Sequence, residues 1–322
     1  MYYSSHNVTS SRRARIKKRR RFVLFSFLLL CSGILIIVSF LLKSKKTSTP
    51  TKQVLVSTVK PSPAVLSALQ DEGLESAVET ALEGTKGSYG VYIKNLKTNV
   101  VFMRNDHISY DAASLYKLWI MGVAYNQIES GRLKKDQTLS QDVKVLNEKF
   151  DIASEAAEMA EGKVTLTVSQ ALEKMITISD NYAALLLAEK VRLSTVGDYL
   201  KEKGLNESTV GTNGSTPKTT ASDVALFFEK LYRGELGNAD STESMFTLLK
   251  NQRLNNKIPK NLPDGTVIAH KTGELYMNTH DAGIVYTEKG DYIIVVLSKS
   301  DNPEAAEGRI GNISEGVFNF FN

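Results

Sequence analysis

Hydrophobic and polar positions divide the chain into an apolar segment near its start and a long alternation of helical and β-rich stretches after it. Residues 22–42 carry no charge, and eight Lys or Arg stand directly before them in residues 12–21. At 1.5 Å rise per residue, a helix over 22–42 spans roughly 30 Å, the thickness of a bilayer's hydrocarbon core. The pattern predicts a basic cytoplasmic arm over 1–21 and a single transmembrane anchor over 22–42. The rest of the chain is then extracytoplasmic, because the basic flank stays in the cytoplasm.

A cleaved signal peptide is the alternative explanation of this segment. Its apolar part is usually about 7–15 residues long and ends at a small-x-small cleavage site, which Leu41-Leu42-Lys43 does not provide. We therefore favour a single-pass membrane protein. Residues 43–63 are rich in Ser, Thr, Lys and Pro and have no helical period, so they are predicted to be a flexible linker.

The remainder, 64–322, is predicted to be one α+β domain. Helical spacing over 66–82 is followed by β-rich runs at 90–94 and 100–104 and by an apolar helix over 114–131. The later elements are expected as helices at 168–178, 182–190, 194–203, 221–232, 241–251 and 310–321, and as strands at 267–270, 282–286 and 292–298. This order predicts an antiparallel sheet assembled from both ends of the domain, flanked by the N- and C-terminal helices and packed beside an all-helical lobe.

Composition and charge exclude several classes of protein. The 322 residues are 42% hydrophobic and 23% charged, which excludes disorder, collagen and coiled coil, and a single Cys excludes a disulfide framework and a thiolate zinc site. The net charge of +5 is segregated: residues 1–70 hold 13 Lys or Arg and no acid, whereas residues 71–322 hold 27 bases and all 35 acids. Because the positive charge lies in an arm and not on a folded face, we expect no nucleic-acid partner.

The string Ser114-Leu115-Tyr116-Lys117 places a hydroxyl and an amine three residues apart, so on a helix both side chains share a face and can touch. The same spacing begins at Ser57, in the linker, and at Ser215, in a loop before Pro217. Ser114 differs because it opens the apolar helix. Free backbone N–H groups and the positive end of the helix dipole at such a position stabilise an anion that forms beside the serine.

Two tripeptides complete a set of three motifs. Ser179-Asp180-Asn181 stands between two predicted helices, and Lys271-Thr272-Gly273 stands on a predicted strand. In this order the motifs resemble those of the class A β-lactamases and related penicillin-recognising serine D,D-peptidases, over essentially all of 64–322. The resemblance implies the β-lactamase and penicillin-binding-protein fold. It also implies a serine hydrolase that forms an acyl-enzyme with a β-lactam or a D-Ala-D-Ala peptide.

The resemblance implies a role for each catalytic position. Ser114 would be the acylating nucleophile and Lys117 the group that takes its proton. An ammonium cannot be a base, but burial and the nearby cation Lys271 both lower a lysine's pKa. Ser179 would pass a proton to the leaving nitrogen, and the oxyanion hole would be the backbone N–H groups of Ser114 and Glu274.

The binding positions follow in the same way. Asn181 would hold the substrate's side-chain amide, Thr272 and Lys271 the substrate carboxylate, and Gly273 would let a strand backbone approach closely. His280 lies where many class A enzymes have an arginine that helps to bind the carboxylate. The histidines have no metal-ligand spacing, so no metal or other cofactor is expected, and the protein is expected to be a monomer.

One departure from class A concerns the acid that activates the deacylating water, normally in a Glu-x-x-Leu-Asn string on a loop. The matching string here begins at Glu202, at the end of a predicted helix, and the stretch 210–220 has no acid. Glu202 and Glu207 are the candidates for a replacement. If neither serves, β-lactam turnover is slow, which favours a D,D-carboxypeptidase over a β-lactamase. A non-catalytic β-lactam or muropeptide sensor is a third hypothesis, disfavoured by the short cytoplasmic arm.

Overall fold

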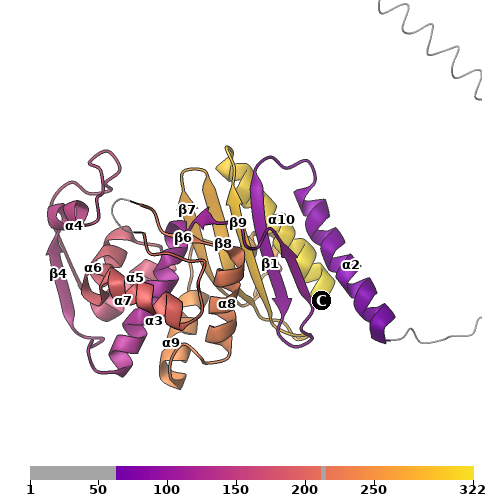
Figure 1. Cartoon of the computed structure of the whole chain (residues 1–322), viewed down its shortest axis with the longest axis horizontal. Coiled ribbons are helices and arrows are strands. Elements are labelled where there is room, and N and C mark those ends of the chain that lie inside the picture. The colour runs from indigo at the N-terminus through magenta and orange to yellow at the C-terminus, as the bar shows by residue number, and fades with distance from the viewer. Residues whose placement is uncertain (1–62, 212–214) are drawn as a thin grey trace, which may run out of the picture. The chain divides into compact units, whose positions relative to one another are not determined.

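A five-stranded antiparallel sheet lies at the centre of the domain, in the strand order β2-β1-β9-β8-β7 (Figure 1). The first two strands come from the start of the domain and the other three from its end, as the sequence predicted. Strand β7 lies at one edge of the sheet. The bounds are β1 (Ser88–Asn95), β2 (Val101–Arg104), β7 (Ile268–Leu275), β8 (Asn278–Val285) and β9 (Tyr292–Lys299).

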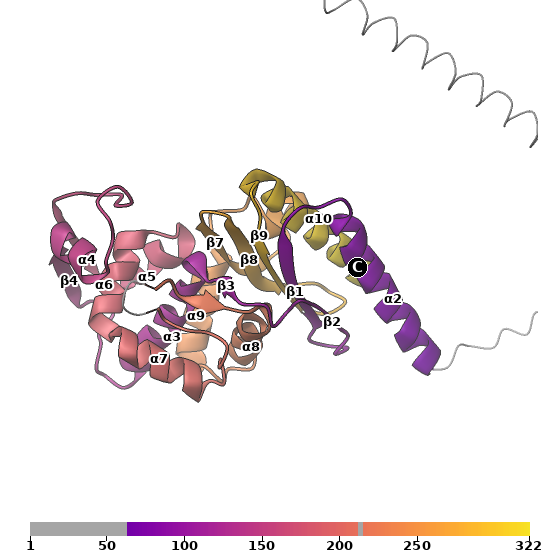
Figure 2. The same ribbon diagram turned by 45° about the horizontal axis from the view of Figure 1, so that its top comes forward.

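Both faces of the sheet are covered. Alternate residues of the buried run Tyr292–Leu297 in β9 enter two different hydrophobic cores. One core lies under α2 (Pro63–Leu82) and α10 (Pro303–Phe321), which run along the same face (Figure 2). The other lies under the helical lobe. Burial on both faces explains why β9 is a continuous apolar run without a polar alternation.

The helical lobe is built around α3 (Tyr116–Glu129), in which every residue from Lys117 to Tyr125 is buried. Side-chain caps fix where its neighbours begin: Thr167 caps α5 in a reciprocal pair with Gln170, and Asp180 caps α6. The other helices of the lobe are α5 (Val168–Thr177), α6 (Asn181–Val191), α7 (Leu193–Glu202), α8 (Ala221–Tyr232) and α9 (Ala239–Lys250).

The lobe is not entirely helical, which corrects one part of the prediction. Strand β4 (Thr138–Asp142) pairs with β5 (Lys163–Thr167), and β3 (Tyr110–Asp111) pairs with β6 (Lys218–Thr219). Both strand pairs are short and largely polar, so the sequence has no hydrophobic alternation from which to predict them. The lobe also contains α4 (Val143–Lys149), and two 3-10 turns, η1 (Ala113–Leu115) and η2 (Ile258–Asn261), precede α3 and β7.

This computed structural model describes residues 63–211 and 215–322, and residues 61–322 form one compact unit. The predicted basic arm, the anchor and nearly all of the linker lie outside the described residues. Within the described part, no helix is long and apolar enough to cross a bilayer.

Candidate active site

Ser114 lies in the 3-10 turn η1, directly before α3. The preceding Ala113 has a φ of 44°, in the left-handed region that favours glycine. The turn packs tightly on the edge strand, because a Cβ placed on Gly273 would lie 3.3 Å from both the Ala112 carbonyl oxygen and the Leu115 side chain. Glycine is therefore the residue that lets β7 approach the serine turn so closely.

Lys117 is fully buried one turn further on, at the start of α3. Its Nζ donates to the Ser179 carbonyl oxygen at 2.6 Å, to Ser179 Oγ at 3.2 Å and to Asn181 Oδ1 at 2.7 Å. No hydrogen bond joins Ser114 to Lys117, and the Ser114 side chain has no hydrogen-bond partner among the described residues. All three acceptors around Nζ belong to the Ser179-Asp180-Asn181 motif.

Ser179 joins the two lysines of the motifs. Its Oγ accepts hydrogen bonds from Lys117 at 3.2 Å and from Lys271 at 3.0 Å. The residue has a φ of 58°, a conformation that places its side chain between α3 and β7. The next residue, Asp180, caps α6 by accepting from the Ala183 N–H at 2.8 Å. The motifs therefore meet at one hydroxyl, although 92 residues separate Ser179 from Lys271.

Burial changes the protonation of both lysines. It lowers the pKa of Lys117 to about 7, against the opposing effect of Asp180 and Glu158. Burial, and then the charge of Lys117, lower the pKa of Lys271 well below its usual value. Both shifts disfavour the ammonium form, so the pair supplies a neutral amine near neutral pH.

On β7, Lys271 is buried and donates to the carbonyl oxygen of Thr272 at 2.8 Å. The Glu274 side chain is exposed and pairs with Lys257, whose own side chain is fully buried and lies 3.8 Å from Glu307. No sequence motif includes Lys257, which lies in the segment between α9 and η2. Its positive charge is a further cause of the lowered pKa of Lys271.

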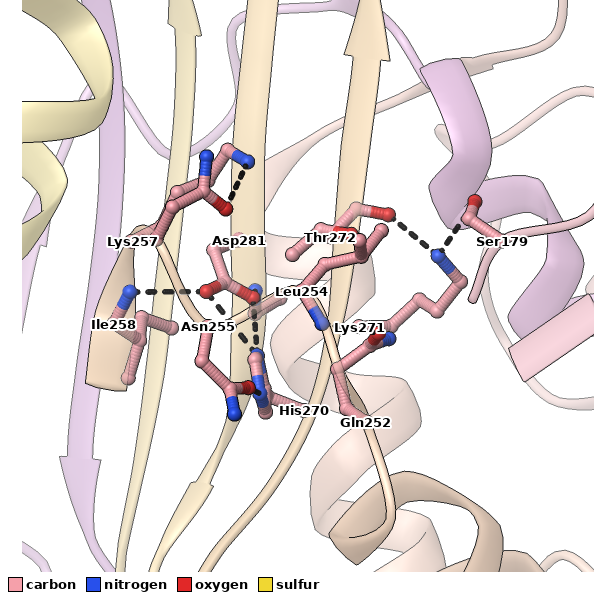
Figure 3. Close-up of polar contacts among 12 residues, drawn as sticks. Ser179, Gln252, Leu254, Asn255, Lys257, Ile258, His270, Lys271, Thr272 and Asp281 are labelled. Carbon is pink, nitrogen blue, oxygen red and sulfur yellow. Dashed lines mark hydrogen bonds and ion pairs between the residues drawn. The ribbon is translucent and has the colours of Figure 1, made fainter. Parts of the chain in front are cut away.

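A buried histidine–aspartate pair supports β7 from the side opposite to Lys271 (Figure 3). His270 Nδ1 lies 2.9 Å from Asp281 Oδ1, and His270 Nε2 lies 3.1 Å from Asn255 Oδ1. Asp281 also accepts from the Ile258 N–H at 3.0 Å. Adjacent residues of a strand point to opposite faces, so these contacts hold the backbone of β7 while Lys271 extends toward Ser179.

His280, expected from the sequence to help bind the substrate carboxylate, has a buried ring with no free nitrogen to offer that group. The side chain is fully buried; Nε2 donates to the Asp111 carbonyl oxygen at 2.8 Å, and Nδ1 accepts from the Ser298 N–H at 3.1 Å. Burial lowers its pKa to about 4, so the ring is neutral. Both ring nitrogens are occupied, and the residue ties β3, just before Ser114, to the sheet.

The two acids proposed to replace the missing deacylating glutamate have other partners. Glu202 is exposed and pairs with Lys203 at 3.1 Å. Glu207 contacts His107 at 3.0 Å and accepts from Thr220 Oγ1 at 2.8 Å. In the described part of the chain, neither carboxylate bonds to a residue of the three motifs.

A different acid does contact the motifs. Asn181 Nδ2 donates to Glu158 Oε1 at 2.6 Å, so both ends of the Asn181 amide are engaged, one by Glu158 and the other by Lys117. Glu158 comes from the segment between α4 and β5, which holds four acids and no base over 151–162. Sequence reasoning missed it because no motif spacing connects it to Asn181. No cluster of acids, histidines or cysteines in the described residues has the composition of a metal site.

Comparison with known proteins identifies the family. A model described as "Beta-lactamase enzyme family" matches residues 73–321. The chain belongs to the β-lactamase enzyme family. The class A resemblance inferred from the motifs is thereby confirmed, and the protein is a serine β-lactamase-type hydrolase.

Individual relatives are distant. The extended-spectrum β-lactamase PER-1 of Pseudomonas aeruginosa is 24% identical over 271 residues, covering 77% of this chain and 87% of that protein. Among solved structures, a β-lactamase from Sphaerobacter thermophilus matches with a TM-score of 0.68 and 24% identity, covering 78% of this chain and 96% of that one. PBP-A matches with a TM-score of 0.67 and 20% identity, covering 77% and 95%. These structures confirm the predicted α+β fold.

Proposed function

We propose that the protein is a membrane-anchored, extracytoplasmic serine hydrolase that forms an acyl-enzyme on Ser114 and hydrolyses the β-lactam amide bond. The observation that carries this proposal is the convergence of Lys117 and Lys271, two buried amines, on the single hydroxyl of Ser179. The relatives named β-lactamases support the choice of substrate. The anchor and the extracytoplasmic location rest on the apolar run 22–42 and its basic flank.

In the proposed acylation step, neutral Lys117 takes the proton of Ser114 Oγ, which attacks the β-lactam carbonyl carbon. For this step Lys117 must give up one of its hydrogen bonds to Ser179 and form one to Ser114 Oγ. Catalytic hydrogen bonds often shorten only when substrate is bound. The backbone N–H groups of Ser114 and Glu274 stabilise the negative oxygen. When the carbon–nitrogen bond breaks, the leaving nitrogen takes a proton from Ser179 Oγ, which is replenished through its hydrogen bond to Lys117.

The edge strand β7 would orient the substrate. Lys271 and Thr272 would bind its carboxylate, and Gly273 keeps the strand close to Ser114. Asn181 would donate to the amide oxygen of the acyl side chain. Lys257 adds a buried positive charge next to Glu274.

A D,D-carboxypeptidase acting on peptidoglycan stem peptides is the second candidate, and one observation favours it. Glu202 and Glu207 are both paired at a distance from the motifs, so neither is placed to activate a deacylating water. Acylation would proceed as above, with the terminal D-Ala as the leaving amine. A penicilloyl group would leave slowly, whereas the peptidyl acyl group of the shortened stem peptide can be released to water or an amine.

The experiment that tests both candidates uses fluorescent penicillin on the purified full-length protein, with labelling followed over time. Labelling that decays within minutes supports the β-lactamase. Persistent labelling together with release of D-Ala from a stem pentapeptide supports the carboxypeptidase. A protein that takes no label while Ser114 is intact contradicts the acyl-enzyme proposal in both forms.

A further inference from the structure

A small cavity opens beside Asn181, on the side of α3 that carries Tyr116. Its volume is about 170 Å³, and its walls include the apolar side chains Ile152, Ala156 and Leu185. Of the described residues that line it, Glu158 alone carries a charge. The cavity therefore combines apolar walls with one carboxylate next to the Asn181 amide, which is expected to bind the substrate.

The position of Glu158 is fixed by its neighbour in sequence. The Tyr182 hydroxyl accepts from the Met159 N–H at 3.1 Å and lies 2.8 Å from the Met159 carbonyl oxygen. Tyr182 belongs to α6, so the segment that carries Glu158 is held against the helix that begins with Asn181. Glu158 has no cation within ion-pair distance among the described residues, and its hydrogen bond is to the Asn181 amide.

This arrangement conflicts with the binding of a neutral acyl group. Asn181 Nδ2 already donates to Glu158 at 2.6 Å, and a substrate amide oxygen must compete for the same N–H donors. Because Glu158 is exposed, a carboxylate displaced by a substrate without a positive charge returns to water and offers that substrate no attraction. A substrate with an ammonium group offers Glu158 a new and stronger partner.

We propose that Glu158 is a specificity-determining residue that selects substrates with a protonated amine on the acyl side, next to the amide bound by Asn181. This inference rests on the proposed function. The apolar walls accommodate a short carbon chain, the carboxylate pairs with the ammonium, and Asn181 is released to the substrate amide. The substrate class is an acyl group bearing a primary amine, in a β-lactam or in a peptide.

The test compares ampicillin with benzylpenicillin, which differ by one amino group on the acyl side chain. Second-order acylation constants are measured on the full-length protein and on Glu158→Gln, in which glutamine keeps an acceptor for Asn181. The preference for ampicillin over benzylpenicillin should fall by about fivefold in the variant, the size of a partly exposed charge pair. In the wild type the preference should also disappear above about pH 8, where an α-amino group loses its proton.

The matched control is Glu155→Gln, which removes an exposed acid of the same segment whose partner is Ser154. An unchanged preference in Glu158→Gln, or an equal loss in Glu155→Gln, overturns the proposal. Failure of the proposed function looks different: neither penicillin then acylates the wild type, and the specificity proposal falls with it.

Discussion

The surroundings of Ser179 and the segment from Glu202 to Thr220 differ in how they use charged groups. Around Ser179, side chains from α3, α6 and β7 meet with two fully buried amines and short hydrogen bonds. In the segment 202–220, the acids Glu202 and Glu207 are exposed and pair with local partners. Burying a lysine costs free energy, and buried amines with a lowered pKa are concentrated at functional sites. The difference supports the proposed acyl-enzyme on Ser114. In the described part of 202–220, neither acid bonds to a residue of the three motifs.

The largest expected effect comes from removing the proposed base. Lys117→Ala should lower the rate of acylation by fluorescent penicillin by about 10²–10⁴-fold, the usual contribution of a general base. Lys144→Ala is the control, since the Lys144 side chain is 80% exposed. If the Lys117→Ala protein folds and is labelled at the wild-type rate, Lys117 is not the base for acylation.

His280 lies outside that chemistry, and its replacement should affect stability instead. His280→Leu leaves the Asp111 carbonyl oxygen and the Ser298 N–H without these buried partners. The free energy of unfolding should fall by about 2–4 kcal/mol, as expected for two unsatisfied buried groups. Denaturant unfolding measures this loss. If His280→Leu keeps the wild-type stability but binds penicillin more weakly, His280 helps to bind the substrate carboxylate.

The pH dependence of acylation reports on Lys117 directly. Its pKa is lowered to about 7 by burial, and only the neutral amine can accept a proton. The acylation rate should therefore rise about tenfold per pH unit below that pKa and level off above it. Rates measured with fluorescent penicillin across this range test the shape. A rate that is independent of pH through neutrality would show that another group is the base.

The smallest effect is expected in the second region. Glu202→Gln and Glu207→Gln should each change the rate of penicilloyl release by less than about twofold, because exposed pairs contribute little. The release of fluorescent label from the acylated protein measures this rate. A large loss in either variant would mean that the segment 202–220 rearranges to supply the deacylating acid.

The sequence predicted the parts of the molecule that depend on local patterns. The sheet from both ends of the domain, the buried helix after Ser114 and the convergence of the three motifs follow from hydrophobic period and motif order. The pairs β3–β6 and β4–β5 were missed because they are short and polar. Glu158 and Lys257 were missed because their importance arises only from tertiary contacts, to Asn181 and to Glu274. The backbone partners of His280 could not be predicted, because a strand position does not reveal which backbone groups its ring will contact.

The most direct test of the acyl-enzyme is to treat the full-length protein with benzylpenicillin and map the adduct by mass spectrometry, with Ser114→Ala in parallel. We expect one penicilloyl group on the peptide that contains Ser114, and no adduct in Ser114→Ala. An adduct on another residue, or one that persists in Ser114→Ala, would contradict the assignment of Ser114 as the nucleophile.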